Sequence, residues 1–518
     1  MSNLTSYFFT PANTRPPRNE TTPSEGVNFF SWLFQLTLVG VVTLTVGVTP
    51  PVGWVFWAPL GGVALFVVAT QVGFPPGVTA WWISLGGFLL VGAAAVGGWS
   101  APVGVVTPTL LLDSVGLPYV FLTVSLLPVV VLASLDPIRK NQVTYYFWVL
   151  FLGGVLVLCF CVRDFLTFYV LFEVLGFPMF LLIGQYGPRP QRVNAAYKFF
   201  VYTFGGSAFI LPVLVYLQFW LGSTEVFFLQ GVQFTEYEQA LFFGLCAVPF
   251  GVKIPVVPLH LWLPEAHVEA PTPISMLLAG LLLKTGGYAF IRFLLPVFPH
   301  GGYTWGPLLS GVAVFSVVAA SLYALVQVDM KRMIAYASVA HMSVVLLGIL
   351  TGTPEGSIGA TYLMLAHGYT SAGLFAGIGV LYDRYHTRTV RYYGGLAGVM
   401  PVFGVSFFLL TLGNLSFPFT GGFTGEFMIL AALGVSNVWV CFLAGATVFL
   451  SLCYSVWLFN RLFYGPVGHF RTHQELTPPE VGVLGWTTLW TVGLGFGGGV
   501  FVGSTQDCYE YVVGFFGG

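Results

Sequence analysis

The chain has 518 residues, of which 56% are apolar and only 7% are charged, and its mean hydropathy is +0.86. Soluble domains carry roughly 25% charged residues, so this composition indicates a chain whose main solvent is lipid. The net charge of −1 leaves no basic surface of the kind that binds nucleic acid, and that class of function is excluded. We expect an all-α membrane protein.

The first 29 residues are polar and Pro-rich, and their two arginines are balanced by two glutamates. A secretory signal would need an apolar core here, and a transit peptide would avoid acids and carry more arginine. We therefore expect a polar N-terminal extension over residues 1–29, with no cleavable presequence.

Apolar runs of about 20 residues, the length of a spanning helix, recur through the rest of the chain. They start near residues 30, 54, 79, 113, 142, 164, 196, 239, 272, 305, 332, 356, 402, 436 and 482. The runs predict one bundle of 14 or 15 transmembrane helices. We divide it into N-terminal transmembrane helices (30–110), a core (111–465), and a C-terminal transmembrane helix with its tail (466–518).

Basic residues gather in alternate loops after residue 113, which indicates that these loops lie on one face of the membrane. They are Arg139, Lys140, Arg189, Arg192, Lys331, Arg332, Arg384, Arg388, Arg391, Arg461 and Arg471. By the positive-inside rule this face is the matrix or the cytoplasm, and the loop of Glu265 and Glu269 is its acidic exception. The number of crossings after Arg471 places the C-terminus on the opposite face.

Ionisable residues interrupt several apolar spans, where a charge costs roughly 2.5 to 3.5 kcal/mol on insertion scales. They are Asp113, Glu173, Lys198, Lys253, Lys284, His341, His367 and Glu426. Glu173, Lys253, Lys284 and Glu426 lie deep in apolar runs, which favours an ion or proton path. Lys198 and Asp113 lie near span ends, where a side chain can reach the interface, and the two histidines could instead be core residues bonded to carbonyls.

Two spans are interrupted by proline or glycine, which predicts broken helices. Pro255 and Pro258 follow Lys253, and Pro418 with four glycines precedes Glu426. On a continuous helix Lys253, His260 and His267 would share one face at intervals of seven residues. Two such breaks about 170 residues apart are typical of inverted repeats. We expect repeat halves of roughly 142–298 and 305–464.

Several segments resemble the antiporter-like subunits of respiratory complex I, the proton-translocating NADH:ubiquinone oxidoreductase. The first is KIPVVPLHLWLPEAHVEAPTPISMLLAGLLLKTGGY, and the others are DMKRMIAYASVAHMS, AHGYTSAGLF and TGGFTGEFMIL. The resemblance covers roughly residues 110–465, and the AHVEAP segment favours the subunit 4 branch of the mitochondrial enzyme. The polar extension and the run near residue 30 depart from the pattern, and we expect that run to be an additional span or an incomplete crossing.

The resemblance implies a role in proton transfer for eight residues. Glu173 matches the glutamate of the first half-channel, Lys253 its partner on the broken helix, Lys284 the central lysine and Glu426 the terminal acid. The histidines of the central hydrophilic axis are matched by His260, His267, His341 and His367. We expect Glu173 and Lys253 to face each other within direct or water-bridged reach.

The resemblance also implies where the electrons travel. NADH, FMN, iron–sulfur clusters and ubiquinone would belong to other subunits of the complex, and we expect no cofactor or metal in this chain. Its six cysteines lack the close spacing of metal and cluster sites. Partners would be other membrane-arm subunits, among them paralogues, together with accessory subunits and lipids. The expected location is the mitochondrial inner membrane, with a bacterial plasma membrane as the alternative.

Two other functions are compatible with a bundle that carries these residues. A free-standing cation/proton antiporter subunit would use the same charges without a redox partner. A b-type cytochrome would need paired axial histidines on facing spans, whereas these histidines lie one to a span apart from His260 and His267.

Overall fold

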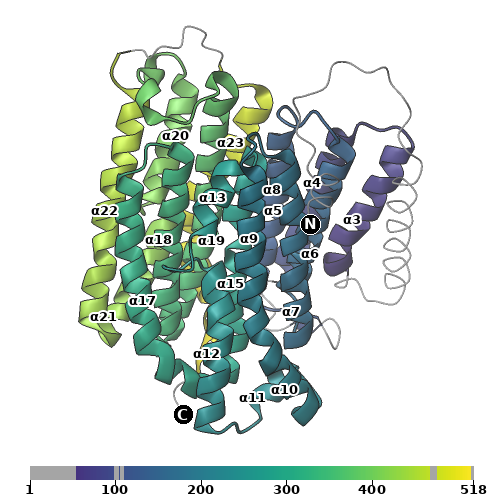
Figure 1. Ribbon diagram of the computed structural model, residues 1–518, viewed down its shortest axis with the longest axis vertical. Helices are drawn as coiled ribbons and strands as arrows, with labels where there is room; N and C mark the ends of the chain where they lie inside the picture. Colours follow the sequence, from purple (N-terminus) through teal and green to yellow (C-terminus); the bar gives the residue numbers. More distant parts are fainter. Residues whose placement is uncertain (1–53, 99–103, 106–109, 467–474, 515–518) are drawn as a thin grey trace.

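A computed structural model describes residues 54–98, 104–105, 110–466 and 475–514 of the chain. These residues form a bundle of upright helices with α3 and α4 at one side (Figure 1). Nine helical runs among the described residues are long and apolar enough to cross a membrane. The expected all-α membrane fold is confirmed, and the expected total of 14 or 15 spans stays a prediction. The polar extension and the run near residue 30 lie outside the described residues.

The elements before the first broken helix are α3 (Trp54–Gln71), α4 (Pro76–Gly98), β1 (Gly104–Val105), β2 (Leu111–Leu112), α5 (Leu117–Ser134), α6 (Gln142–Cys159), α7 (Phe165–Val174), α8 (Gly176–Tyr186), α9 (Arg192–Ser207), η2 (Ala208–Ile210), α10 (Leu211–Leu221) and α11 (Val226–Gln230). The two short strands pair antiparallel, with Gly104 opposite Leu112.

The following elements are α12 (Glu236–Lys253), α13 (Trp262–Glu269), α14 (Thr272–Leu277), η3 (Leu278–Leu282), α15 (Lys284–Ala289), η4 (Phe290–Leu294), α16 (Leu295–Val297), α17 (Pro299–Leu325), α18 (Met330–Leu350), α19 (Pro354–Tyr385), η5 (Val390–Tyr392), η6 (Leu396–Gly398), α20 (Pro401–Asn414), α21 (Gly421–Ser436), α22 (Val438–Phe463) and α23 (Pro478–Gly514). From residue 54 onward, each expected run coincides with a helix or with consecutive helices.

Polar residues at the membrane ends start several of these helices by satisfying backbone N–H groups that have no partner within the helix. The Asp164 carboxylate accepts a hydrogen bond from the Thr167 N–H at 2.8 Å. Thr235 and Glu238 form a capping box at α12, and Asp329 accepts from the Lys331 N–H at 2.9 Å. Helix boundaries therefore follow local chemistry, whereas the spans themselves follow hydropathy.

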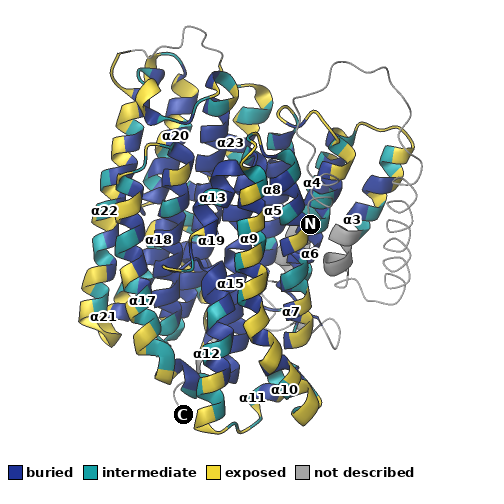
Figure 2. Ribbon diagram, in the orientation of Figure 1, coloured by how far each residue is buried: buried dark blue, intermediate teal, exposed yellow. Residues whose placement is uncertain are grey.

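The core of the bundle is formed by α19 and by the helical run from α14 to α16 (Figure 2). Every residue of α19 from Gly356 to Leu381 is buried. Gly280 and Gly368 allow the two elements to approach closely, because a Cβ on Gly368 would lie 3.1 Å from the Gly280 carbonyl oxygen. This approach brings Lys284 of α15 and His367 of α19 into the same buried region.

The outer surface of the bundle is apolar. Phe219, Val435 and Trp439 are exposed to 83%, 90% and 79%, and residues coloured as exposed follow the outer helices in Figure 2. An apolar surface of this kind is a contact surface for lipid or for other membrane chains.

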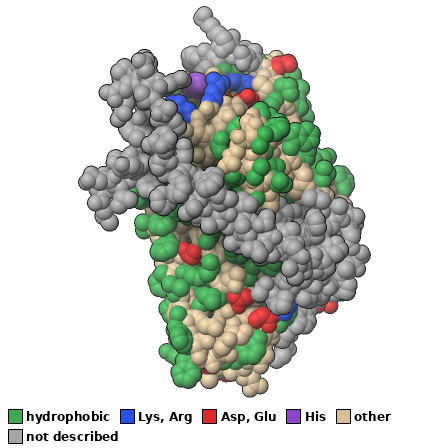
Figure 3. All heavy atoms as spheres, turned by 90° about the vertical axis from the view of Figure 1, so that its right-hand side faces the viewer, with side chains coloured by type: hydrophobic (Ala, Val, Ile, Leu, Met, Phe, Trp, Pro, Cys, Tyr) green, Lys and Arg blue, Asp and Glu red, His purple; other side chains and the backbone are tan. Residues whose placement is uncertain are grey.

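In the side view, most of the visible acidic side chains lie in the lower half and most basic ones near the upper end (Figure 3).

The expected clustering of basic loops agrees with the tertiary structure. Arg139 and Arg388, from two different connections, and Lys331, at the start of α18, line one cavity. Helix α23 starts at the same face, where Glu480 forms an ion pair with Arg384 at 2.6 Å, and continues to the opposite end of the bundle (Figure 1). The described part of α23 therefore runs in the direction expected for the C-terminus.

Close packing of α19 on α21 gives a stability prediction. A Cβ on Gly425 would lie 2.6 Å from the Leu363 backbone nitrogen, whereas the nearest atom to a Cβ on Gly434 is 3.9 Å away. Because backbone atoms cannot give way, Gly425→Ala should destabilise the fold by about 1–3 kcal/mol. Gly434→Ala is the matched control on the same helix. A thermal melt of the detergent-solubilised protein should show a lower Tm for Gly425→Ala alone, and equal Tm values would contradict the described packing.

Candidate functional site: a buried line of charged and polar groups

Both expected helix breaks are present. Residues 254–261 separate α12 from α13, and residues 415–420 separate α20 from α21. The Trp262 indole N–H donates to the Val252 carbonyl at 3.0 Å, and the Val257 N–H donates to the Ser316 hydroxyl at 2.5 Å. Irregular backbone is tolerated at membrane depth only where protein or a wet cavity satisfies it. Because of the first break, Lys253, His260 and His267 lie on α12, in the break and on α13, and do not share a continuous helix.

Lys253 is the last residue of α12, and its side chain lies in an aromatic environment. Its ammonium is 4.8 Å from the ring centroid of Phe172 and 5.8 Å from that of Phe199. Glu173, on α7, is partly buried and interacts electrostatically with Lys253. The two residues are thus close enough to interact electrostatically, but no direct hydrogen bond or ion pair between them is found among the described residues. Their expected facing arrangement and their energetic coupling stay predictions.

Lys284 lies in α15 between two π-helical segments, η3 and η4. Its Nζ donates to the Ala279 carbonyl at 2.5 Å and is 2.9 Å from Nδ1 of His367. An ammonium at Lys284 requires His367 to accept at Nδ1 and therefore to carry its proton on Nε2. The same contact is compatible with a neutral lysine and a His367 that is protonated at Nδ1. The shared proton can therefore reside on Lys284 or on His367.

His341 of α18 and Glu426 of α21 form the second pair, with 2.9 Å between Nδ1 and Oε1. Both side chains are less than 10% exposed. The rings of His341 and His367 are 5.7 Å apart between centroids. The four side chains therefore form a line from Lys284 through His367 and His341 to Glu426, in which the step between the two histidines is the only one without a direct hydrogen bond among these residues.

The two remaining predicted histidines form no hydrogen bond with this line in the described structure. The His260 ring is stacked with Tyr323 at 6.3 Å. His267 is fully buried and stacked on Phe375 at 4.5 Å, and it interacts electrostatically with Lys284. Neither ring nitrogen of His267 has a hydrogen-bond partner among the described residues.

Tertiary structure separates Asp113 and Lys198 from the buried line. Asp113 forms a buried ion pair with Arg292 at 2.5 Å and accepts from the Gly116 N–H at 2.9 Å. Lys198 is paired with Glu265 at 2.7 Å, and both side chains are partly exposed. The charge of each residue is thus balanced by an ion-pair partner, and a structural role accounts for its presence in the span.

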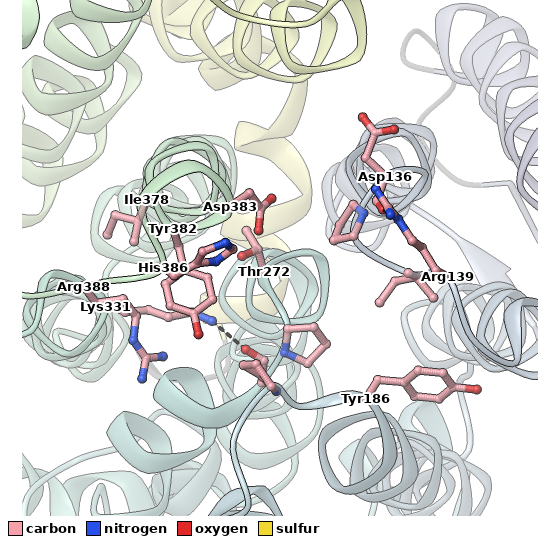
Figure 4. A pocket seen from close by; sticks show the side chains of 15 residues that line it. Asp136, Arg139, Tyr186, Thr272, Lys331, Ile378, Tyr382, Asp383, His386 and Arg388 are labelled. Carbon is pink, nitrogen blue, oxygen red and sulfur yellow. Dashed lines mark hydrogen bonds between the residues drawn. The ribbon is translucent and has the colours of Figure 1, made fainter. Parts of the chain in front are cut away.

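Sequence reasoning did not assign a role to a cavity at the basic face. It has a volume of about 540 Å³ and is lined by residues such as Arg139, Lys331, Asp383 and Arg388 (Figure 4). The loops that form it were recognised only as carriers of positive charge. No pattern within a single span signals that they meet.

No group of three or more His, Cys, Asp or Glu side chains that could hold a metal ion is found in the described part of the chain. His341 and His367, the histidines on neighbouring spans, are hydrogen-bonded through Nδ1 to Glu426 and Lys284. This arrangement fits proton transfer, and nothing in it favours axial ligation of a haem.

A family profile described as NADH:quinone oxidoreductase/Mrp antiporter, TM matches residues 162–451, a range that contains all eight predicted proton-transfer residues. NADH-ubiquinone oxidoreductase chain 4 of Chondrus crispus is 41% identical over 378 residues, which are 73% of this chain and 77% of the relative. The chain belongs to the NADH-ubiquinone oxidoreductase chain 4 family. The expected resemblance is confirmed.

Other relatives agree with membership of the chain 4 family. NADH-quinone oxidoreductase subunit M of Rhodobacter capsulatus is 38% identical over 398 residues, covering 74% of this chain and 77% of the relative. A chain of respiratory complex I from Thermus thermophilus has a TM-score of 0.81 at 27% identity and covers 90% of this chain and 100% of its own. A chain of an archaeal membrane-bound sulfane sulfur reductase has the same TM-score at 20% identity, which shows a shared fold alone.

The contrast between buried and exposed ion pairs gives a second prediction. Asp113→Asn removes the charge that faces Arg292 at a buried site and should destabilise the protein by roughly 3–5 kcal/mol. Glu265→Gln, at a partly exposed pair with Lys198, should cost less than about 1 kcal/mol. Urea or thermal denaturation in detergent measures both variants. Equal losses of unfolding free energy in the two variants would contradict the claim that burial makes the Asp113–Arg292 pair more important for stability.

Proposed function

We propose that this chain is a proton-translocating, antiporter-like subunit in the membrane arm of respiratory complex I, located in the mitochondrial inner membrane. Membership of the chain 4 family supports the assignment to the complex. The observation that carries the transport role is the buried contact of Lys284 with His367, at 2.9 Å, which continues through His341 to Glu426.

The proton moves along this line by exchange between neighbours. The Lys284 ammonium gives a proton to Nδ1 of His367, which releases its Nε2 proton towards Nε2 of His341. His341 then gives its Nδ1 proton to the Glu426 carboxylate. A water molecule between the histidines completes the middle step, because their rings are 5.7 Å apart. Each transfer moves one positive charge and leaves each histidine neutral with its proton on the other nitrogen, so both rings must return to their first tautomer before the next proton passes.

The pair of Glu173 and Lys253 acts as the switch of the first half. A carboxylate near a lysine stabilises its ammonium, and moving the carboxylate away favours release of the proton. Moving one charge across 100 mV requires about 2.3 kcal/mol. The free energy for this movement comes from NADH oxidation and ubiquinone reduction in other subunits, which hold the FMN and the iron–sulfur clusters.

The partners of the chain are the neighbouring membrane-arm subunits, among them its paralogues, together with accessory subunits and lipids. The exposed apolar helices provide surfaces for such contacts. A free-standing cation/proton antiporter is the alternative, since the family description also includes Mrp antiporters. Affinity purification of the chain from mild detergent distinguishes the two. Flavin and NADH-oxidising activity should copurify, and their absence would favour the antiporter.

The role of the central lysine is tested by Lys284→Met. The methionine keeps an unbranched side chain but holds no proton, so NADH-driven proton pumping should fall at least tenfold in sealed vesicles. Lys198→Met is the control, because Lys198 is partly exposed and lies outside the buried line. Full pumping by an assembled Lys284→Met complex would exclude the proposed path.

The switch is tested by Glu173→Gln. The amide keeps the size of the side chain but removes the charge that acts on Lys253. The complex should assemble normally, while pumping and the quinone reductase turnover coupled to it are impaired. Blue-native electrophoresis measures assembly, and dye quenching measures pumping. An assembled variant that pumps at the full rate would contradict the switch.

A further inference from the structure

The cavity at the basic face lies where several spanning helices end or begin. We call it the basic-face cavity, and its volume of about 540 Å³ is within the range of about 300–1,000 Å³ that is typical of ligand sites. Its lining residues lie at or next to the ends of the spans Leu117–Ser134, Phe165–Tyr186, Thr272–Val297, Met330–Leu350 and Pro354–Tyr385. Because these ends mark the edge of the apolar region, the cavity lies at the level of the lipid headgroups.

The walls of this cavity carry charges of both signs. In Figure 4, Asp136 and Arg139 lie on one side of Thr272. Asp383 and Arg388 lie on the other side. Neither of the two carboxylates forms an ion pair among the described residues. A ligand that complements both walls therefore carries a negative and a positive group.

Arg388 has a free hydrogen-bond donor at this cavity. Its side chain is buried, its Nη1 donates to the Val268 carbonyl, and its Nε lies 3.4 Å from a carboxylate oxygen of Asp329. Its Nη2 is also buried and has no hydrogen-bond partner among the described residues. A buried donor without a partner is unfavourable, and the guanidinium group is well suited to phosphate oxygens. A phosphate in the cavity would satisfy this donor.

An apolar groove adjoins the basic-face cavity between α5, α19 and α23. It has a volume of about 50 Å³, and it shares with the cavity the residues Asp136, Pro137, Thr272 and Asp383. Its other walls include the apolar side chains of Leu132, Ala133, Ala376, Val380, Val483 and Leu484. Leu132 and Ala133 are partly exposed. A charged cavity that continues into an apolar groove fits a molecule with a polar head and a hydrocarbon tail.

We propose that the basic-face cavity binds the headgroup of one zwitterionic aminophospholipid, such as phosphatidylethanolamine. Arg139 and Nη2 of Arg388 bind the phosphate, while Asp136 and Asp383 bind the ammonium group. The apolar groove holds the first methylene groups of an acyl chain, and the rest of the chain extends along the apolar outer surface. The bound lipid thereby connects the ends of spans that are far apart in sequence. This inference concerns lipid binding and does not depend on the proposed proton path.

Water and an anionic phospholipid are the competing occupants of the cavity. Water alone would fill the space, since one molecule needs about 10–15 Å³ of it, but it would not account for the adjoining apolar groove. An anionic phospholipid carries a net negative charge, which Asp136 and Asp383 would repel. The test therefore compares lipids that differ in the charge of the headgroup.

The first experiment is photocrosslinking of the assembled complex in liposomes that contain phosphatidylethanolamine with a diazirine close to its acyl ester. Peptide mass spectrometry should find the label at Leu132 or Ala133. Unlabelled phosphatidylethanolamine should displace this label about tenfold more effectively than phosphatidylglycerol, the usual effect of one hydrogen bond to a charged group. Phe449, exposed on α22, is the control site, where both lipids should displace the label equally. No label in the groove, or equal displacement from it by the two lipids, would overturn the proposal.

The second experiment repeats the crosslinking with three variants of exposed residues. Arg139→Gln removes a cation from the cavity wall and should reduce the label in the groove about tenfold. Lys140→Gln is the matched control, because Lys140 does not line the cavity, and it should leave the label unchanged. Asp136→Asn should abolish the preference for phosphatidylethanolamine, which a purely structural role of Asp136 would not affect. Equal labelling of the two cation variants, or an unchanged preference in Asp136→Asn, would contradict the assigned site.

Discussion

The Lys284 side chain lies in the fully buried centre of the bundle, where the contacts with His367 and the Ala279 carbonyl replace the water that would surround an ammonium outside. A charge at membrane depth requires such partners because lipid offers none. The close approach of α19 to η3, which Gly280 and Gly368 permit, makes these contacts possible. The position of the charged line therefore depends on small residues that carry no charge themselves.

The same requirement explains why the two interrupted helices are placed against protein. The Val252 carbonyl, just before the irregular stretch of residues 254–261, accepts from the Trp262 indole N–H, and the Val257 N–H within it donates to the Ser316 hydroxyl. The second interruption allows α21 to present Glu426 to His341. Breaking a helix thus has a structural cost that the neighbouring helices offset, and it places ionisable groups inside the membrane where two helices can share them.

Much of the fold could be predicted from sequence, because a lipid solvent restricts spanning segments to apolar helices. The runs from residue 54 onward and both breaks agree with the structure. The partners could not be predicted in the same way. Lys284 meets His367 across 83 residues and His341 meets Glu426 across 85, and such pairing depends on how helices pack. Arg292, the partner of Asp113, was not recognised within its apolar run, and Lys331 was counted only as a loop charge.

The central claim is that the buried groups form one continuous path for protons. A cryo-EM map of the assembled complex, at a resolution that shows ordered water, tests it most directly at the step between His341 and His367. The account predicts a water molecule hydrogen-bonded to both imidazoles, and water that joins the pair of Glu173 and Lys253 to Lys284. A dry apolar gap between the two histidines, with no polar group bridging them, would contradict it.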